Sequence, residues 1–161
     1  MNALTAQTVE LLQQLIRNRC VNDGTVGSGQ EVRTTATLES YLEGSGLDLE
    51  VHEPEGAPGR ASLVARIEGT DPAAPTLCLM GHTDVVPVTP EHWTRDPFGG
   101  ELVDGEVWGR GAIDMLNLTA SQAVALGFTR GWNQIFRTGI VEHPLKELCR
   151  VYVSKTIDCH Y

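Results

Sequence analysis

Hydrophobic residues near the start of the chain recur at the spacing of one helix face. The stripe consists of Val9, Leu11, Leu12, Leu15 and Ile16. Spacing of three and four residues is typical of an amphipathic helix that buries one side. Thr5 or Thr8 is a suitable N-cap, because a hydroxyl oxygen can accept a free backbone N–H of the first turn. The pattern therefore predicts a first, half-buried helix.

A capping motif predicts a second helix soon afterwards. Ser28-Gly29-Gln30-Glu31 places Ser and Glu three residues apart, the capping-box spacing in which each side chain satisfies the other's backbone donor. The expected buried face consists of Val32, Ala36, Leu38, Tyr41 and Leu42. Gly44 or Gly46 can end this helix, because glycine adopts the left-handed conformation of a helix C-terminus at little cost.

Apolar runs separated by turn residues then predict strands at about 48–53, 62–68 and 76–82. The third run contains Leu77-Cys78-Leu79-Met80, which is continuous rather than alternating. Continuous apolar strands are typical of sheets that are covered on both faces. We therefore expect the α/β class, with a mostly parallel sheet covered by helices.

Three further elements complete the expected fold. The segment Val103-Asp104-Gly105-Glu106-Val107 predicts a hairpin with an Asp-Gly turn. A helix is expected over about 116–126, and residues 148–153 are compatible with a strand.

Composition narrows the class of protein. A length of 161 residues suits about one domain, and 41% hydrophobic with 20% charged residues is an ordinary globular balance. The net charge of −9 argues against nucleic acid and anionic membrane surfaces as partners. No apolar run approaches the length needed to span a bilayer, and no export signal is recognisable. The four cysteines lack metal-binding spacing, so we expect a cytoplasmic protein with reduced thiols.

The composition changes near residue 127. Residues 1–127 hold 18 acidic and 7 basic residues, whereas residues 128–161 hold 3 acidic and 5 basic ones. Both lysines lie in the second part and all twelve alanines in the first. This change predicts a boundary at residue 127 and a tail, 128–161, that could derive from a shifted reading frame.

Candidate chemistry follows the third expected strand. His82 and Asp84 are two residues apart, so they share a face if the strand continues. A carboxylate in that position can accept the second N–H of a metal-binding imidazole and fix its tautomer. Taken alone, the pair favours a hydrogen-bonded core histidine beside an Asp that caps a turn.

The residues that follow favour the metal-binding interpretation. They are Trp93, Asp96-Pro97-Phe98, Asp104-Gly105, Trp108-Gly109-Arg110-Gly111-Ala112 and Asp114-Met115. With Gly81-His82-Thr83-Asp84, this order resembles the M20 family of zinc-dependent amidohydrolases and exopeptidases. The family includes acetylornithine deacetylases, succinyl-diaminopimelate desuccinylases, aminoacylases and carboxypeptidases. The resemblance covers residues 1–127 and implies the N-terminal portion of a zinc-peptidase catalytic domain.

The resemblance also implies roles for three residues. His82 would bind one zinc ion, Asp84 would orient His82 as part of the catalytic machinery, and Asp114 would bridge two zinc ions. The implied reaction is metal-dependent hydrolysis of an amide bond in an N-acyl amino acid or a peptide. Many members have Lys after the Asp-Met pair, where this chain has Leu116-Asn117. We interpret that difference as a subgroup variant.

Other parts of the family pattern have no counterpart in these 161 residues. They are an adjacent Glu-Glu pair that supplies the general base and a zinc ligand, a further acidic ligand, a histidine ligand and a dimerisation domain. Glu142-His143 is the nearest imitation of the acidic pair. We therefore expect this chain by itself to be a poor hydrolase. A sheet that stops after its first strands leaves an unpaired edge, so we also expect association through that exposed sheet edge. The alternatives are a non-catalytic interaction or metal-binding module, and an enzyme completed by a second polypeptide.

Overall fold

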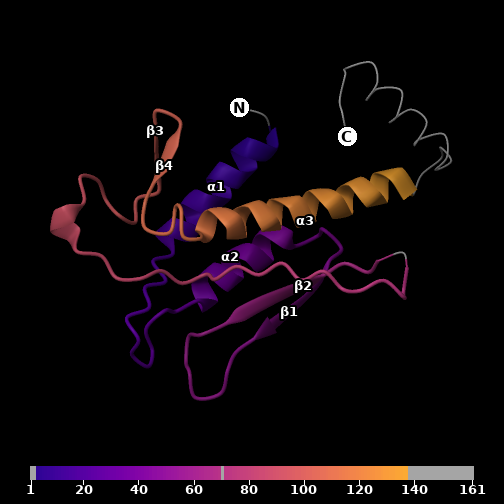
Figure 1. Ribbon diagram of the computed structural model, residues 1–161, viewed down its shortest axis with the longest axis horizontal. Coiled ribbons are helices and arrows are strands. Elements are labelled where there is room, and N and C mark those ends of the chain that lie inside the picture. The colour runs from indigo at the N-terminus through magenta and orange to yellow at the C-terminus, as the bar shows by residue number, and fades with distance from the viewer. Residues whose placement is uncertain (1–2, 70, 138–161) are drawn as a thin grey trace.

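The computed structural model describes residues 3–69 and 71–137 (Figure 1). In chain order the elements are α1 (Ala3–Arg17), α2 (Val32–Leu42), β1 (Asp48–His52), β2 (Ser62–Arg66), the 3-10 turn η1 (Pro90–His92), β3 (Glu101–Val103), β4 (Glu106–Trp108) and α3 (Leu116–Arg137). The core forms where α1 packs against α3, with α2 and β2 completing it.

Helix α1 confirms the first predicted helix. Leu11, Leu12, Leu15 and Ile16 are all buried, as the apolar stripe requires. The predicted cap is wrong, because the helix already includes Ala3 and both threonines lie inside it. Thr8 instead donates its hydroxyl to the carbonyl of Leu4, at 2.9 Å. A threonine can satisfy its hydroxyl in this way within a helix, so it does not mark the first turn.

Helix α2 is also where the sequence placed it, but the capping box is wrong. Glu31 makes no side-chain cap, and Ser28 donates its hydroxyl to the carbonyl of Thr25 at 2.8 Å. The carboxylate of Glu31 faces Arg60 instead, so an ion pair displaces the local cap. Gly44, with φ of 74°, follows the end of the helix as expected.

The buried face of α2 differs from the predicted face. It consists of Thr34, Thr35, Leu38 and Leu42. Ala36 is exposed, and Val32 and Tyr41 are half-buried. The hydroxyl of Thr34 lies 3.1 Å from the buried thiol of Cys20, and that of Thr35 donates to the carbonyl of Ala61 at 3.5 Å. These partners allow polar residues to be buried, which a pattern based on hydropathy cannot predict.

The described strands form two antiparallel hairpins. Strand β1 pairs with β2, and β3 pairs with β4. In the second hairpin, Asp104 and Gly105 both have positive φ, 52° and 87°, which confirms the predicted Asp-Gly turn. Within the described residues, parallel pairing is limited to one bridge between Val21 and Val85. The expected mostly parallel, helix-covered sheet is therefore not found in this part of the chain.

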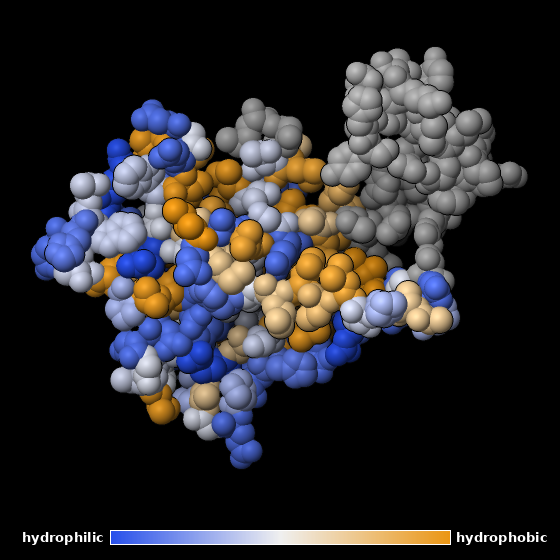
Figure 2. Space-filling model, in the orientation of Figure 1, coloured by the Kyte–Doolittle hydropathy of each residue, from blue (hydrophilic) through white to orange (hydrophobic). Residues whose placement is uncertain are grey.

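The segment 76–82, expected to be a buried strand, is extended but unpaired. Leu77 and Met80 are 81% and 80% exposed, and Leu79 is 58% exposed. Figure 1 shows the segment crossing the molecule between α3 and the β1–β2 hairpin, and Figure 2 shows apolar surface along this crossing. A parallel strand takes its backbone partners from neighbouring strands, and no described residue supplies one here. The apolar run therefore stays at the surface.

Helix α3 begins at Leu116, as predicted, and continues to Arg137. The change of composition at residue 127 thus falls inside a helix, and the proposed domain boundary stays a prediction. The possible strand at 148–153 and the pair Glu142-His143 lie outside the described residues. Among the helices of the described ranges, none combines the length and the hydropathy needed to cross a bilayer.

Gly111 carries the chain from β4 toward α3 at a tightly packed position. Its φ is +88°, and a Cβ there would lie 2.6 Å from Leu116 and 2.7 Å from Val85. We expect Gly111→Ala to lower the free energy of unfolding by about 1–3 kcal/mol in urea denaturation, because the methyl group overpacks the core. Gly24→Ala is the matched control, since Gly24 has φ of +85° with open space around it. Equal losses in the two variants would refute the packing explanation.

Candidate metal-binding site

The structure brings His82, Asp84 and Asp114 together. The ring Nδ1 of His82 lies 3.2 Å from Oδ1 of Asp84, and its Nε2 lies 3.2 Å from Oδ1 of Asp114. His82 and Asp84 follow the extended segment, whereas Asp114 lies in the turn before α3. Two loops that are far apart in sequence therefore form one group.

Backbone pairing fixes the first of these loops. The N–H of Val85 donates to the carbonyl of Cys20 at 2.9 Å, and the N–H of Asn22 donates to the carbonyl of Val85 at 2.8 Å. Val85 itself is buried in the core. Val85, the residue that follows Asp84, is thus anchored to the chain that follows α1.

Helix α3 anchors the same loop from the other side. Thr119, which is buried in the first turns of the helix, donates its hydroxyl to the carbonyl of His82 at 3.1 Å. Three residues later, Gln122 donates its side-chain amide to the carbonyl of Met80 at 3.5 Å. Residues three apart lie on one helix face. The helix that follows Asp114 therefore also holds the backbone of His82.

The hydrogen-bond partners of the His82 ring indicate which nitrogen carries the hydrogen when the ring is neutral. Nδ1 lies 2.9 Å from the backbone carbonyl of Asp84 and 3.2 Å from its carboxylate. Both partners can only accept, and so can the carboxylate of Asp114 beside Nε2, at 3.2 Å. A protonated ring satisfies all three acceptors, and in the neutral ring the two acceptors at Nδ1 favour the hydrogen there. Nε2 then presents a lone pair toward the carboxylate of Asp114. Two electron-rich atoms that face each other need a cation or a proton between them.

The proton affinity of the ring reflects this arrangement. Partial burial lowers the pKa of His82, but hydrogen bonds to Asp114 and to the Asp84 carbonyl, together with both carboxylate charges, outweigh it. The net effect is a pKa above the ordinary histidine value. The surroundings of His82 therefore favour positive charge.

The spacing of the two donors fits a metal ion. Tetrahedral zinc with ligand distances of about 2.0–2.2 Å separates two donor atoms by about 3.3–3.6 Å. Nε2 of His82 and Oδ1 of Asp114, which are 3.2 Å apart, lie close to that range. The side chains are 44% and 89% exposed, so an ion can reach both. The described residues contain no group of three or more His, Cys, Asp or Glu side chains placed around one ion. They thus provide part of a coordination shell.

Two residues that the sequence analysis did not identify contact Asp84. Asn22 donates its side-chain amide to Oδ2 at 2.7 Å, and Nη2 of Arg60 lies 4.0 Å from the same oxygen. Asn22 and Asp84 are 62 residues apart, and neither contact residue belongs to a recognisable motif. No sequence signal could have found them, because the bridge between Val21 and Val85 brings Asn22 beside Asp84, and the ion pair with Glu31 holds Arg60.

The residues around the Trp-Gly-Arg-Gly-Ala segment pack against one another. The guanidinium of Arg110 lies 5.3 Å from the ring centre of Trp93 and donates to the carbonyl of Pro87 at 3.4 Å. Phe98 packs against the core and beneath the guanidinium of Arg19. Trp93 and Phe98 therefore serve as packing residues.

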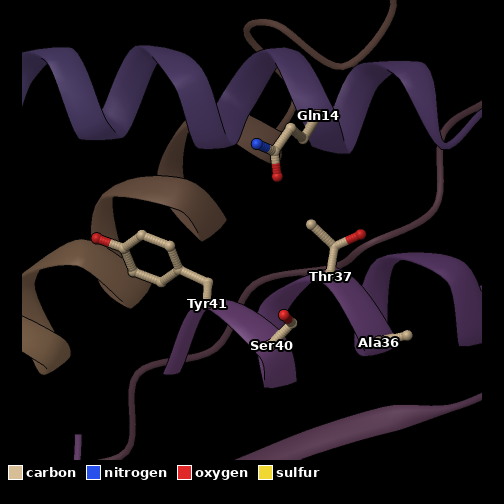
Figure 3. Close-up of a pocket in the computed structure, with 5 residues that line it drawn as sticks. All are labelled: Gln14, Ala36, Thr37, Ser40 and Tyr41. Atoms are coloured by element: carbon tan, nitrogen blue, oxygen red, sulfur yellow. The ribbon is translucent and has the colours of Figure 1, made fainter. Parts of the chain in front are cut away.

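An open hollow of about 420 Å³ lies between α1 and α2, away from the histidine group (Figure 3). Its lining consists of Gln14, Ala36, Thr37, Ser40 and Tyr41. Burial raises the pKa of the Tyr41 phenol, so this hydroxyl stays neutral. The lining offers no carboxylate, imidazole or thiol, and the candidate chemistry therefore belongs to the His82 group.

Comparison with known proteins agrees with the motif. Residues 78–131 match the family described as Peptidase family M20/M25/M40. This segment resembles M20 hydrolases. The matched range contains His82, Asp84 and Asp114 and ends four residues beyond the change of composition.

Curated relatives extend the similarity toward the N-terminus. A succinyl-diaminopimelate desuccinylase of Beijerinckia indica is 45% identical over 104 residues, which cover 62% of this chain and 26% of the relative. One of Rhodospirillum centenum is 38% identical over 123 residues, covering 74% and 29%. The aminoacylase-1 of Sus scrofa is 46% identical over 70 residues, covering 43% and 17%. The chain thus spans about a quarter of the length of the desuccinylases that it matches.

Proposed function

We propose that this M20-like region forms the first part of a metal-dependent amide hydrolase site, with zinc as the metal. The observation that supports the proposal best is the pair of donors, Nε2 of His82 and Oδ1 of Asp114, 3.2 Å apart at the end of the matched motif. The names of the similar proteins denote removal of acyl groups. An N-acyl amino acid or a peptide is therefore the proposed substrate class.

Each residue has a distinct task in this proposal. A bound divalent ion would polarise the amide carbonyl and lower the pKa of a water molecule. His82 would hold the ion through Nε2, and Asp114 would supply an oxygen ligand that can bridge to a second ion. Asp84 would keep the hydrogen on Nδ1 of His82, so that the Nε2 lone pair stays available. Asp84 would act through His82, because its Oδ1 faces Nδ1 of the ring.

A module that binds metal without turnover is the second candidate. One observation favours it for a polypeptide of these 161 residues: the described part supplies donors but places no third carboxylate beside them as a general base. Completion by another polypeptide would restore the enzyme. The domain assignment, with residues 1–127 as the N-terminal portion and 128–161 as an unmatched tail, stays part of this proposal.

Zinc binding tests the proposal. We expect isothermal titration of the chain with Zn²⁺ to show weak binding, far short of the 10–16 kcal/mol of a complete four-ligand site, and His82→Ala to abolish it. His92→Ala is the matched control, because His92 is exposed in the η1 turn. Equal binding by wild type and His82→Ala would contradict the assignment. Loss of binding in His92→Ala would place the ion elsewhere.

The exposed extended segment leads to a prediction about association. We expect the chain to self-associate as its concentration rises, because Leu79 and Met80 expose apolar side chains in a segment that pairs with no described strand. Sedimentation velocity should show a larger monomer fraction for Leu79→Lys/Met80→Lys. Val26→Lys is the control, since Val26 is 85% exposed in a separate loop. A wild-type chain that stays monomeric at all concentrations would refute the prediction.

A further inference from the structure

Oδ2 of Asp84 is held by groups that lie outside the motif. Asn22 donates its amide to this oxygen at 2.7 Å, while the other carboxylate oxygen, Oδ1, faces Nδ1 of His82 at 3.2 Å. The carboxylate is therefore fixed at both oxygens. Because Asn22 also anchors Val85 through its backbone, one residue sets both the main chain and the side chain of the Asp84 loop.

A buried carboxylate directs an arginine toward the same oxygen. Glu31 is only 4% exposed, and its Oε2 lies 2.7 Å from Nε of Arg60. Nη2 on the same guanidinium lies 4.0 Å from Oδ2 of Asp84. A guanidinium is planar and rigid, so the contact with Glu31 at Nε sets the direction of Nη2.

The burial of Glu31 is difficult to explain by stability alone. Taking an ion pair out of water usually costs as much as the attraction returns, and apolar replacements are often neutral or stabilising. Neither oxygen of Glu31 has a hydrogen bond of good geometry within the described residues. The Glu31–Arg60 pair lies between α2 and the Asp84 loop, and a role in orienting Arg60 toward Asp84 accounts for this position.

We propose that Asn22 and Arg60 are positioning residues for the metal site, and that Glu31 holds Arg60 in place for this purpose. They fix the Asp84 carboxylate, which in turn keeps the hydrogen of His82 on Nδ1 and turns Nε2 toward Asp114. The inference rests on the proposed metal-binding role of His82. It adds a chain of polar contacts from the N-terminus of α2 to His82 that no motif in the sequence marks.

Imidazole nitrogen NMR of the full 161-residue chain tests the proposal, with Zn²⁺ as the probe. Spectra taken near pH 9, above the ordinary histidine pKa of about 6.5, report the tautomer of neutral His82. The His82 signals are identified by their loss in His82→Ala. The variants are Asn22→Ala, Arg60→Gln and the double variant Glu31→Gln/Arg60→Gln, which leaves no buried carboxylate unpaired. Arg66→Gln is the control, because the partners of Arg66 within the described residues are the exposed Asp48 and Glu50.

We expect the wild type and Arg66→Gln to hold the hydrogen on Nδ1. In Asn22→Ala and in the double variant the population should move toward Nε2–H, and the dissociation constant for Zn²⁺ should rise about 10–100-fold. A tautomer and an affinity that stay at wild-type values in both variants would overturn the inference. If Zn²⁺ leaves the His82 signals of the wild type unchanged, the proposed function fails, and the tautomer comparison still decides the positioning role.

Discussion

A polypeptide of these 161 residues, assayed with N-succinyl or N-acetyl amino acids and added Zn²⁺, is expected to fall short of ordinary enzyme turnover by at least about 10²–10⁴-fold. That factor is the usual contribution of a general base alone. The described residues place only Asp84 and Asp114 beside His82, and the first is committed to the imidazole. Catalytic zinc sites normally use three protein ligands and a water molecule, so incomplete coordination lowers the rate further.

His82→Ala is the control for this assay. Residual hydrolysis that is equal in the wild type and the variant comes from another source. Turnover at ordinary enzyme rates that disappears in His82→Ala would contradict the expectation. Recovery of activity on mixing with a second polypeptide that supplies a carboxylate pair would support completion in trans.

The largest expected loss of stability comes from Leu15→Ala. Leu15 is 1% exposed in the core between α1 and α3. Truncating a buried leucine typically costs about 2–5 kcal/mol, because apolar burial is lost and a cavity is left. Urea denaturation should therefore show a large fall in the unfolding midpoint.

Leu4→Ala is the matched control for this prediction. Leu4 lies on the same helix and is 40% exposed. Its replacement should change the free energy of unfolding by less than about 0.5 kcal/mol, as is usual for surface positions. Similar losses in the two variants would show that α1 does not bury the face described here.

Local patterns predicted the local elements of this fold. The apolar stripe of α1, the Asp-Gly turn at Asp104 and the start of α3 at Leu116 each depend on neighbours within a few residues. The expected parallel sheet depends on strands that are distant in sequence. The run Leu77–Met80 has the composition of a buried strand, but burial requires partners that a local pattern cannot supply.

Sequence patterns likewise predicted only part of the candidate site. His82, Asp84 and Asp114 stood out because their spacing forms part of a motif, and the structure brings them together. Asn22 and Arg60 did not stand out, because their contacts with Asp84 arise from the bridge at Val85 and from the buried Glu31. The spacing from Ser28 to Glu31 indicated a capping box. The same carboxylate can instead pair with an arginine, and sequence spacing does not distinguish the two roles.

X-ray absorption at the zinc edge, on the chain with less than one equivalent of Zn²⁺, tests the central claim most directly. The account predicts scattering from one imidazole with oxygen neighbours, and loss of the imidazole contribution in His82→Ala. Sulfur scattering would contradict it, because a cysteine thiol, such as the exposed one of Cys78, would then be a ligand. An imidazole contribution that persists in His82→Ala would contradict it equally, since another histidine would then hold the ion.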